Sequence, residues 1–365
     1  MTIQGATRPG AVLFDNASHT YDALLFLSFG GPEGMADVIP FLENVTRGRG
    51  IPRSRLDEVA EHYYHFGGVS PINEQNRALI AALEHELREH QITLPIYFGN
   101  RNWRPLLSDT LAEMKADGVR DVLVFVTSAY SSYSGCRQYR EDIKRALGEI
   151  GDDTMRFDKL RVFFNHPGFV EPMAQWVREA RESLPAARRA NSEAIFTAHS
   201  IPLSMARGSA YERQLRETSR LVAELAGVER YRLAWQSRSG SPHIPWLEPD
   251  ILDVIEDLAG QGKSDLIVAP IGFISDHLEV LFDLDVEAQT RAHELGLHMI
   301  RVPTVGTDPR FVSMIRELVK ERLSDNPTRR FLGQLGPSHD ICPLNCCQLD
   351  SGRKSGRPEV ARATA

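Results

Sequence analysis

The chain has 365 residues, of which 42% are hydrophobic and 25% charged, and this composition excludes an intrinsically disordered protein and a small disulfide scaffold. Its 49 acidic residues outnumber its 42 basic ones, so a formal net charge of -7 argues against a nucleic-acid partner or an anionic lipid surface. At roughly 100–200 residues per domain, the length predicts two domains.

The longest apolar runs, 23–29 and 121–129, have the length of strands and fall short of the roughly 18 residues that a membrane-spanning helix needs. Residues 1–20 lack the basic segment and apolar core of a secretory signal. We therefore expect no transmembrane segment and a cytoplasmic location.

Short β-rich runs alternate with amphipathic helical stretches along most of the chain, which predicts an α/β fold with doubly wound parallel sheets. The predicted strands are Tyr21–Phe29, Leu94–Gly99, Asp121–Ala129, Leu160–Phe164, Ala194–His199, Tyr231–Gln236, Asp265–Ile271 and Leu297–Val302. The clearest predicted helices are Ile72–His90, Ala206–Ala226, Pro249–Leu258 and Asp308–Leu323.

An acidic, glycine-bearing stretch at 148–154 predicts a boundary between two similar halves. We expect domains at 20–150 and 151–310, followed by a helix and cysteine-bearing tail at 311–348 that packs back on the first domain. Residues 1–19 and 349–365 lack periodicity, and we expect them to be disordered.

Polar groups that follow the strands are the first candidates for a site, because ligands of open α/β sheets bind at the carboxyl ends of the strands. His199 ends a predicted strand and can accept a proton near neutral pH, although a lone histidine is usually structural. Glu279, Asp283 and Glu287 share one face of a predicted helix. Such a row suits a hard cation or a proton relay, and its alternative is a solvated acidic face.

Two loops add candidate ligand-binding groups. The stretch from Trp235 to Asp250 combines aromatic, guanidinium and small polar side chains between a strand and a helix. Arg47 and Arg49 lie in a glycine-bearing turn, and guanidinium groups suit carboxylate or phosphate ligands. In an acidic protein this local basic pair indicates an anionic ligand.

Taken together, motifs between residues 28 and 285 make the chain resemble the ferrochelatases, and the actinobacterial coproporphyrin branch most of all. The motifs are Ser28-Phe29-Gly30-Gly31-Pro32, Gly67-Gly68-Val69-Ser70-Pro71, Thr197-Ala198-His199-Ser200-Ile201-Pro202, Gln236-Ser237-Arg238, Trp246-Leu247-Glu248-Pro249 and Ser275-Asp276-His277-Leu278-Glu279. The resemblance implies two Rossmann-like domains of the class II chelatase type, a porphyrin cleft between them, and insertion of Fe(II) as a substrate. Transient partners of haem biosynthesis would follow.

The resemblance also implies residue roles. His199 would accept pyrrole protons beside Glu279, both near the substrate iron, while Asp283 and Glu287 would form a route for iron or protons. The implied substrate-binding residues are Phe29, Arg47, Arg49, Ser70, Gln236, Ser237, Arg238 and Trp246. Several relatives have tyrosine at the position of Phe29, and a phenyl ring cannot ligate iron on that face.

Four cysteines complete the candidate set: Cys136, Cys342, Cys346 and Cys347. Their number matches the four thiolates of a [2Fe–2S] cluster, which some ferrochelatases carry. Neighbouring Cys346 and Cys347 can both reach one cluster only on a bent backbone. A zinc site and free buried thiols are the alternatives.

Three other functions stay open on the sequence: protoporphyrin IX as the substrate, a carrier that binds tetrapyrrole or iron without chemistry, and a nucleotide-binding enzyme. The last lacks support, because neither G-x-G-x-x-G after the first strand nor G-x-x-x-x-G-K-[ST] occurs.

Overall fold

The protein is described by a computed structural model that covers residues 14–48, 50–240, 243–343 and 345–349. Two four-stranded parallel sheets form its centre. The first has the order β2-β1-β3-β4 and contains β1 (Ala23–Ser28), β2 (Ile96–Asn100), β3 (Asp121–Val126) and β4 (Arg156–Lys159). The second has the order β6-β5-β7-β8 and contains β5 (Ser192–His199), β6 (Tyr231–Gln236), β7 (Asp265–Ala269) and β8 (His298–Arg301).

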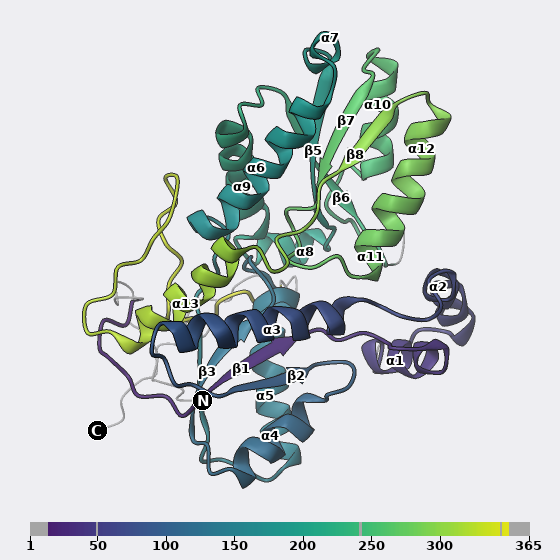
Figure 1. Ribbon diagram of the computed structural model, residues 1–365. Coiled ribbons are helices and arrows are strands. Elements are labelled where there is room, and N and C mark those ends of the chain that lie inside the picture. Colours follow the sequence, from purple (N-terminus) through teal and green to yellow (C-terminus); the bar gives the residue numbers. More distant parts are fainter. Residues whose placement is uncertain (1–13, 49, 241–242, 344, 350–365) are drawn as a thin grey trace, which may run out of the picture.

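The two sheets repeat one strand order, as expected for two similar halves, and Figure 1 shows the first sheet below the second. Parallel strands need crossover connections, so helices flank each sheet. This arrangement confirms the predicted α/β fold with two doubly wound parallel sheets.

The helices of the first half, including the crossover into the second, are η1 (Met35–Asp37), α1 (Val38–Val45), α2 (Arg53–His65), α3 (Ile72–Glu89), α4 (Leu107–Ala116), η2 (Tyr133–Arg137), α5 (Gln138–Glu149) and α6 (Pro167–Ser183). Those that follow are α7 (Ala186–Arg189), α8 (Leu203–Arg207), α9 (Tyr211–Ala226), α10 (Ile251–Gly260), α11 (Leu278–Val280), η3 (Leu281–Ala288), α12 (Gln289–Glu294) and α13 (Pro309–Leu323).

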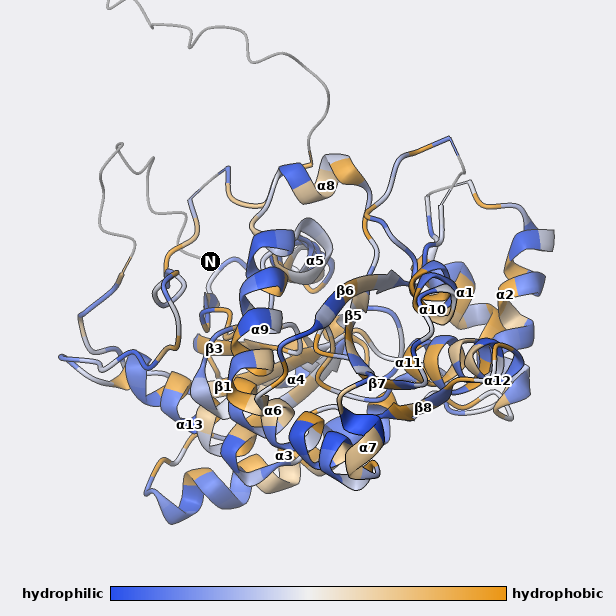
Figure 2. Ribbon diagram, turned by 90° about the horizontal axis from the view of Figure 1, so that it is seen from above, coloured by the Kyte–Doolittle hydropathy of each residue, from blue (hydrophilic) through white to orange (hydrophobic). Residues whose placement is uncertain are grey.

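Strand β1 is apolar at nearly every position because both of its faces are covered. Leu24 and Phe26 point into one cluster of buried residues, while Ala23, Leu25 and Leu27 point into another. The first cluster continues into the second half through residues of β5 and β7. In Figure 2 the central strands β1 and β3 are hydrophobic and the outer helices carry hydrophilic faces.

Two predicted elements differ from the structure. The expected strand Leu160–Phe164 is wrong, because the fourth strand ends at Lys159 and the apolar run after it is buried in an irregular connection. The real strand is short and partly polar, as suits the edge of a sheet. The expected helix Ala206–Ala226 is divided at Gly208, where a Cβ atom would lie 2.2 Å from the Gln348 carbonyl oxygen, so the tail passes there.

The predicted boundary at 150/151 lies one strand too early, because β4 pairs with β3 of the first sheet. We therefore place the join after Lys159. At the other end, α13 packs against α3 and α6. Residues 14–19, expected to be disordered, are hydrogen-bonded to this helix, since His19 N donates to the Arg322 carbonyl oxygen at 3.2 Å. The disorder expected for 1–13 and 350–365 concerns residues outside the described ranges.

Candidate functional site

A cavity of about 420 Å³ lies between α1 and α2 of the first half and the carboxyl end of the second sheet. Its walls come from the end of β1, from α1, α2 and α10, from the loop after β6, and from α11 and η3. The side chains that carry the argument below are Phe29, Arg55, His62, Gln236, Ser237, Arg238, Glu279, Phe282, Asp283 and Glu287.

His199 ends β5 next to this cavity, with its side chain one-third exposed. Its Nδ1 contacts the Ser200 carbonyl oxygen, which can only accept, so Nδ1 carries the hydrogen. Nε2 therefore has a free lone pair, and it lies 3.7 Å from Glu279 Oε2. Tyr211 OH donates to the His199 carbonyl oxygen at 3.0 Å and holds the strand end in place. The pair is thus arranged to accept a proton at Nε2 and to stabilise the resulting imidazolium.

The predicted acidic row starts in α11 and runs along η3, which is a π-helix rather than the expected α-helix. Its wider i→i+5 turn still keeps Glu279, Asp283 and Glu287 on one side, because all three line the cavity. Short π-helical turns within helices are frequent at functional sites. The π-helix η3 is longer than a single turn, with eight residues.

Asp283 occupies the middle of this row and is held by two donors. Ser237 Oγ and Gln236 Nε2 both donate to its Oδ2, the latter at 3.2 Å. Burial raises the pKa of Asp283 to about 7, and the nearby charges of Glu279 and Glu287 act in the same direction. Ser237 has φ +60°, a left-handed conformation that is strained for serine and that stores strain at functional sites in other proteins. The chain accepts this strain where the hydroxyl group reaches Asp283.

Phe29 lines the cavity as predicted and is 36% exposed. Its ring packs edge-on against Phe41, and the Arg101 guanidinium lies 5.8 Å from its centroid on another side. Gln236, Ser237 and Arg238 also line the cavity. These four residues, predicted to bind the substrate, thus all line one cavity.

Of the other predicted binding residues, Ser70, Trp246 and Arg47 are not among the described residues that line the cavity. Ser70 is buried against Gly31, where a Cβ atom would lie 2.7 Å from the Ser70 Cβ, and Trp246 packs on Gly240 and fixes the loop after β6. Arg47 is exposed outside the cavity, and Arg49 lies outside the described residues. Both Ser70 and Trp246 pack against a glycine, and their direct contacts with a ligand stay predictions.

Sequence reasoning missed the wall formed by α2. His62 stacks on Phe282 with ring centroids 3.8 Å apart, so this stack joins the two halves across the cavity. Burial lowers the pKa of His62, which favours its neutral form. The spacing of Leu56, Ala60 and Tyr63, all buried, is that of an amphipathic helix and could have revealed α2.

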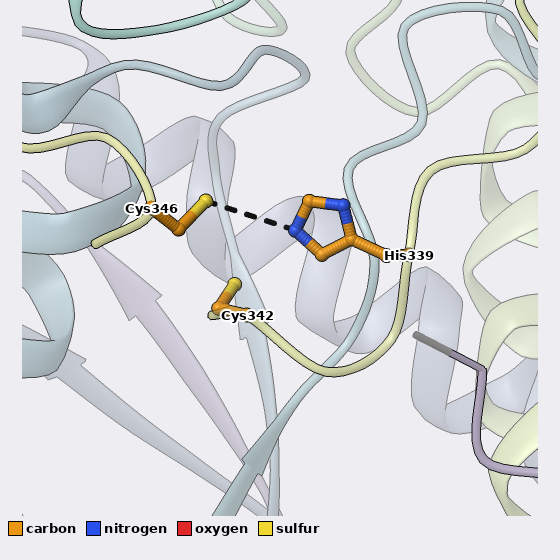
Figure 3. Close-up of side chains that lie close together, drawn as sticks. All are labelled: His339, Cys342 and Cys346. Atoms are coloured by element: carbon orange, nitrogen blue, oxygen red, sulfur yellow. Dashed lines mark hydrogen bonds between the residues drawn. The ribbon is translucent and has the colours of Figure 1, made fainter. Parts of the chain in front are cut away.

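The four cysteines come together at a second site, and none of them lines the cavity described above. Cys136, in the π-turn η2, interacts through its thiol with Cys342 and Cys347, and Cys346 does so with the same two residues. The Cys346 and Cys347 sulfur atoms are 3.7 Å apart. His339 Nε2 lies 3.7 Å from the Cys346 sulfur, as Figure 3 shows. The tail contacts the first half here, where Arg137 Nη1 also donates to the Cys346 carbonyl oxygen at 3.2 Å.

The backbone at this cysteine site has the bend that adjacent cysteines require, since Cys347 has φ +53°. Burial alone would lower the pKa of nearby Lys159, but the charges of the four cysteines raise it above its ordinary value. A cation beside four sulfur atoms suits a site that carries negative charge. These donors could hold a metal ion or a metal cluster.

No helix in the described ranges is long and apolar enough to cross a membrane.

Comparison with known proteins identifies a family and several similar proteins. The ferrochelatase family matches residues 21–323 of this chain. A protein of Streptomyces coelicolor named coproporphyrin III ferrochelatase is 53% identical, covering 94% of this chain and 96% of that protein. A protein of Nocardia farcinica with the same name is 52% identical, covering 89% of this chain and 96% of that protein. A ferrochelatase of Rhodopirellula baltica is 54% identical, covering 93% of this chain and 98% of that protein. The solved structure of the sirohydrochlorin chelatase SirB of Bacillus subtilis, in complex with cobalt, aligns with a TM-score of 0.48 at 11% sequence identity. The alignment covers 83% of this chain and 96% of SirB.

Proposed function

Because the chain belongs to the ferrochelatase family, we propose that it is a chelatase that inserts Fe(II) into coproporphyrin III in haem biosynthesis. The observation that carries this proposal is the His199–Glu279 pair, which presents a free imidazole nitrogen beside a cavity that joins the two halves. The relatives named coproporphyrin III ferrochelatase support the substrate over protoporphyrin IX.

Insertion of iron requires that two pyrrole nitrogens lose their protons as the metal enters. His199 Nε2 accepts one proton, and Glu279 stabilises the positive charge that this creates. Asp283 changes protonation near neutral pH, so it can take up a proton and release it towards Glu287 at the outer end of the row. The same carboxylates attract Fe(II) to the porphyrin face.

The opposite wall binds the macrocycle. Phe29 offers a flat apolar contact without a metal-ligating atom, which leaves the iron to the His199 side. Arg55 and Arg238 place guanidinium groups at the cavity, where they can bind carboxylates of the substrate. Contacts from Arg47 and Arg49 stay predictions, as do the cytoplasmic location and transient partners of haem biosynthesis.

The direct test is anaerobic metallation by the purified protein, with Fe(II) and either coproporphyrin III or protoporphyrin IX. We expect a higher kcat/KM for coproporphyrin III. Insertion into protoporphyrin IX alone would contradict the substrate, and binding of both porphyrins without metallation would identify a carrier instead.

We further propose that Cys136, Cys342, Cys346 and Cys347 hold a [2Fe–2S] cluster. Two observations support the fit: all four thiols form one interacting set, and the strained Cys347 backbone lets both adjacent cysteines take part. When bound, such a cluster cross-links the tail to η2 and can hold one electron. Its position away from the His199 cavity favours a structural role.

The cluster is tested by analysis of anaerobically purified protein. We expect a reddish-brown protein with two irons and two acid-labile sulfides per chain, and loss of the colour in Cys136→Ser. Colourless protein with stoichiometric zinc and no sulfide would show the zinc site instead.

A further inference from the structure

His339 is the one non-cysteine side chain that joins the ligand atoms of the tail in the described ranges: its ring nitrogen and the sulfur atoms of Cys342 and Cys346 all lie within 4.8 Å of one another. Figure 3 shows the ring facing Cys346 from a separate stretch of the tail. The site therefore offers five possible metal ligands, the four thiols and the imidazole, although a [2Fe–2S] cluster uses four protein ligands. One of the five groups therefore has a role other than binding iron.

The thiols already form a complete set without the imidazole. Cys136 and Cys346 each interact with both Cys342 and Cys347, so every sulfur atom has two sulfur neighbours. His339 interacts with the thiols of both Cys342 and Cys346, and its Nε2 lies 3.7 Å from the Cys346 sulfur, which is a normal distance for a hydrogen bond to sulfur. His339 thus borders the set of four at Cys342 and Cys346, while each sulfur atom of the set already has its two sulfur neighbours.

The identity of the donor follows from the chemistry of the two atoms. An iron-bound cysteine sulfur is a thiolate and has no hydrogen, so it can only accept. The imidazole nitrogen that faces it must then carry the hydrogen. We propose that His339 Nε2–H donates a hydrogen bond to the Cys346 sulfur and thereby raises the reduction potential of the cluster.

The sign of the effect is electrostatic. Reduction adds negative charge to the cluster, and a donor aimed at a sulfur ligand stabilises that charge. The removal of the donor therefore makes reduction harder and lowers the potential.

The position of the ring does not depend on the cluster alone. Asp340, the next residue, is almost fully buried and pairs with Arg329 at 2.5 Å. The Asp15 backbone N–H also donates to the Asp340 carboxylate, at 3.3 Å. These contacts fix the chain on one side of His339. On its other side, His339 and Cys346 line a second cavity of about 430 Å³, so the N–H···S contact lies where solvent and small molecules can approach it.

The inference rests on the proposed cluster, and the experiment separates the two. In full-length, anaerobically purified protein we would measure iron and sulfide, the reduction potential and the EPR spectrum of the reduced cluster, for the wild type, His339→Phe and His339→Gln. Phenylalanine keeps a planar ring without a donor, whereas glutamine restores an N–H group. His293→Phe, on α12, is the control for loss of a histidine elsewhere.

We expect two irons and two sulfides in every variant, a lower potential in His339→Phe, and a potential closer to the wild type in His339→Gln. An unchanged potential in His339→Phe with an intact cluster would overturn this inference alone. Loss of the cluster in that variant, or strong nitrogen hyperfine coupling in the wild type, would make His339 a ligand and overturn it as well. Zinc without sulfide in the wild type would overturn the cluster, and with it the inference.

Discussion

The carbonyl oxygen of Ser200 decides which nitrogen of His199 carries hydrogen, and this choice leaves Nε2 free to act as a base. The carboxylate of Glu279 is close enough to stabilise a proton on that nitrogen but has no hydrogen of its own to donate when ionised. The two side chains therefore have distinct tasks, and their separate removal should have different effects.

Glu279→Gln keeps the size of the side chain and removes its charge. We expect kcat for iron insertion to fall roughly 10- to 100-fold, because the amide cannot stabilise the imidazolium, and loss of a carboxylate partner of a histidine at a metal site has an effect of that size. The KM for the porphyrin should change little, because the base and the cavity walls remain. A steady-state assay measures both constants, and an unchanged kcat would contradict the assigned role.

Asp283 predicts a pH dependence of stability. Its pKa of about 7 lies above the ordinary value near 4, so the folded state holds a proton that the unfolded state releases between these values. This contribution to stability is complete below about pH 4 and is lost as the pH rises through 7, by up to roughly 4 kcal/mol at about 1.4 kcal/mol per pKa unit.

Asp283→Asn should therefore be more stable than the wild type at pH 8, and the difference should shrink towards pH 4. Chemical unfolding of both proteins at several pH values measures the difference. A difference in the free energy of unfolding that does not vary with pH would show that Asp283 is ionised in the folded protein. The same variant should insert iron more slowly, since the amide cannot exchange a proton.

Single residues were predictable where their chemistry is local. The position of His199 after a strand and the number of cysteines pointed to two sites before any contact was known. Trp246 and Ser70 could not be placed in this way, because the close packing of Gly240 and Gly31 against them depends on distant segments. His339 gave no signal, since its partner Cys346 is defined only by the fold of the tail.

At the scale of elements, α1 and α2 form an arm with a small core of its own. Residues of both helices, such as Phe41 and Tyr63, form a cluster that reaches the second half through Leu278. The stack of His62 on Phe282 is a second bridge. In Figure 1 these helices lie on the side of the molecule where α11 and α12 lie. These two contacts hold the arm against the second half.

Phe282→Ala should loosen the arm without unfolding the protein. We expect a several-fold higher KM for the porphyrin and faster proteolysis between α1 and α2, while the Tm stays close to the wild-type value. Phe331→Ala, which changes an exposed aromatic residue on the tail, is the matched control. If both variants behave alike, the stack does not hold the arm.

Elements with regular periodicity were predicted well, and irregular ones were not. Strand β6 and helix α3 begin at the expected residues because their patterns are uninterrupted. The apolar run after Lys159 has the composition of a strand, but it leaves the sheet after Leu160, whose N–H still donates to the Val124 carbonyl oxygen. Its Arg161 is buried against Glu321 at 2.7 Å. The π-helix η3 has a sequence that reads as an ordinary helix.

At the scale of the whole molecule, the two sheets share one core. Phe26 of the first sheet and Ile267 of the second belong to the same cluster, and α6, α9 and α13 fill the space between them. Two similar halves were predictable from the alternation of patterns, but a continuous core was not, because periodicity does not show which helix faces both sheets.

The shared core predicts one cooperative thermal transition. Phe169, fully buried in α6, contacts aromatic residues from both halves, including Tyr130 and Phe311. Phe169→Ala should destabilise the protein by about 3–5 kcal/mol. We expect a single calorimetric peak at a lower temperature, as opposed to two separate peaks. Two resolved peaks, in either protein, would show that the halves unfold independently.

The central claim is that His199 accepts a pyrrole proton as iron enters the porphyrin, and the most direct test is anaerobic Fe(II) insertion into coproporphyrin III by His199→Ala. A positioned general base contributes about 10²–10⁴-fold to a rate, so the account predicts a loss of kcat in that range, with porphyrin binding and Tm retained. Insertion by His199→Ala at close to the wild-type rate would contradict it.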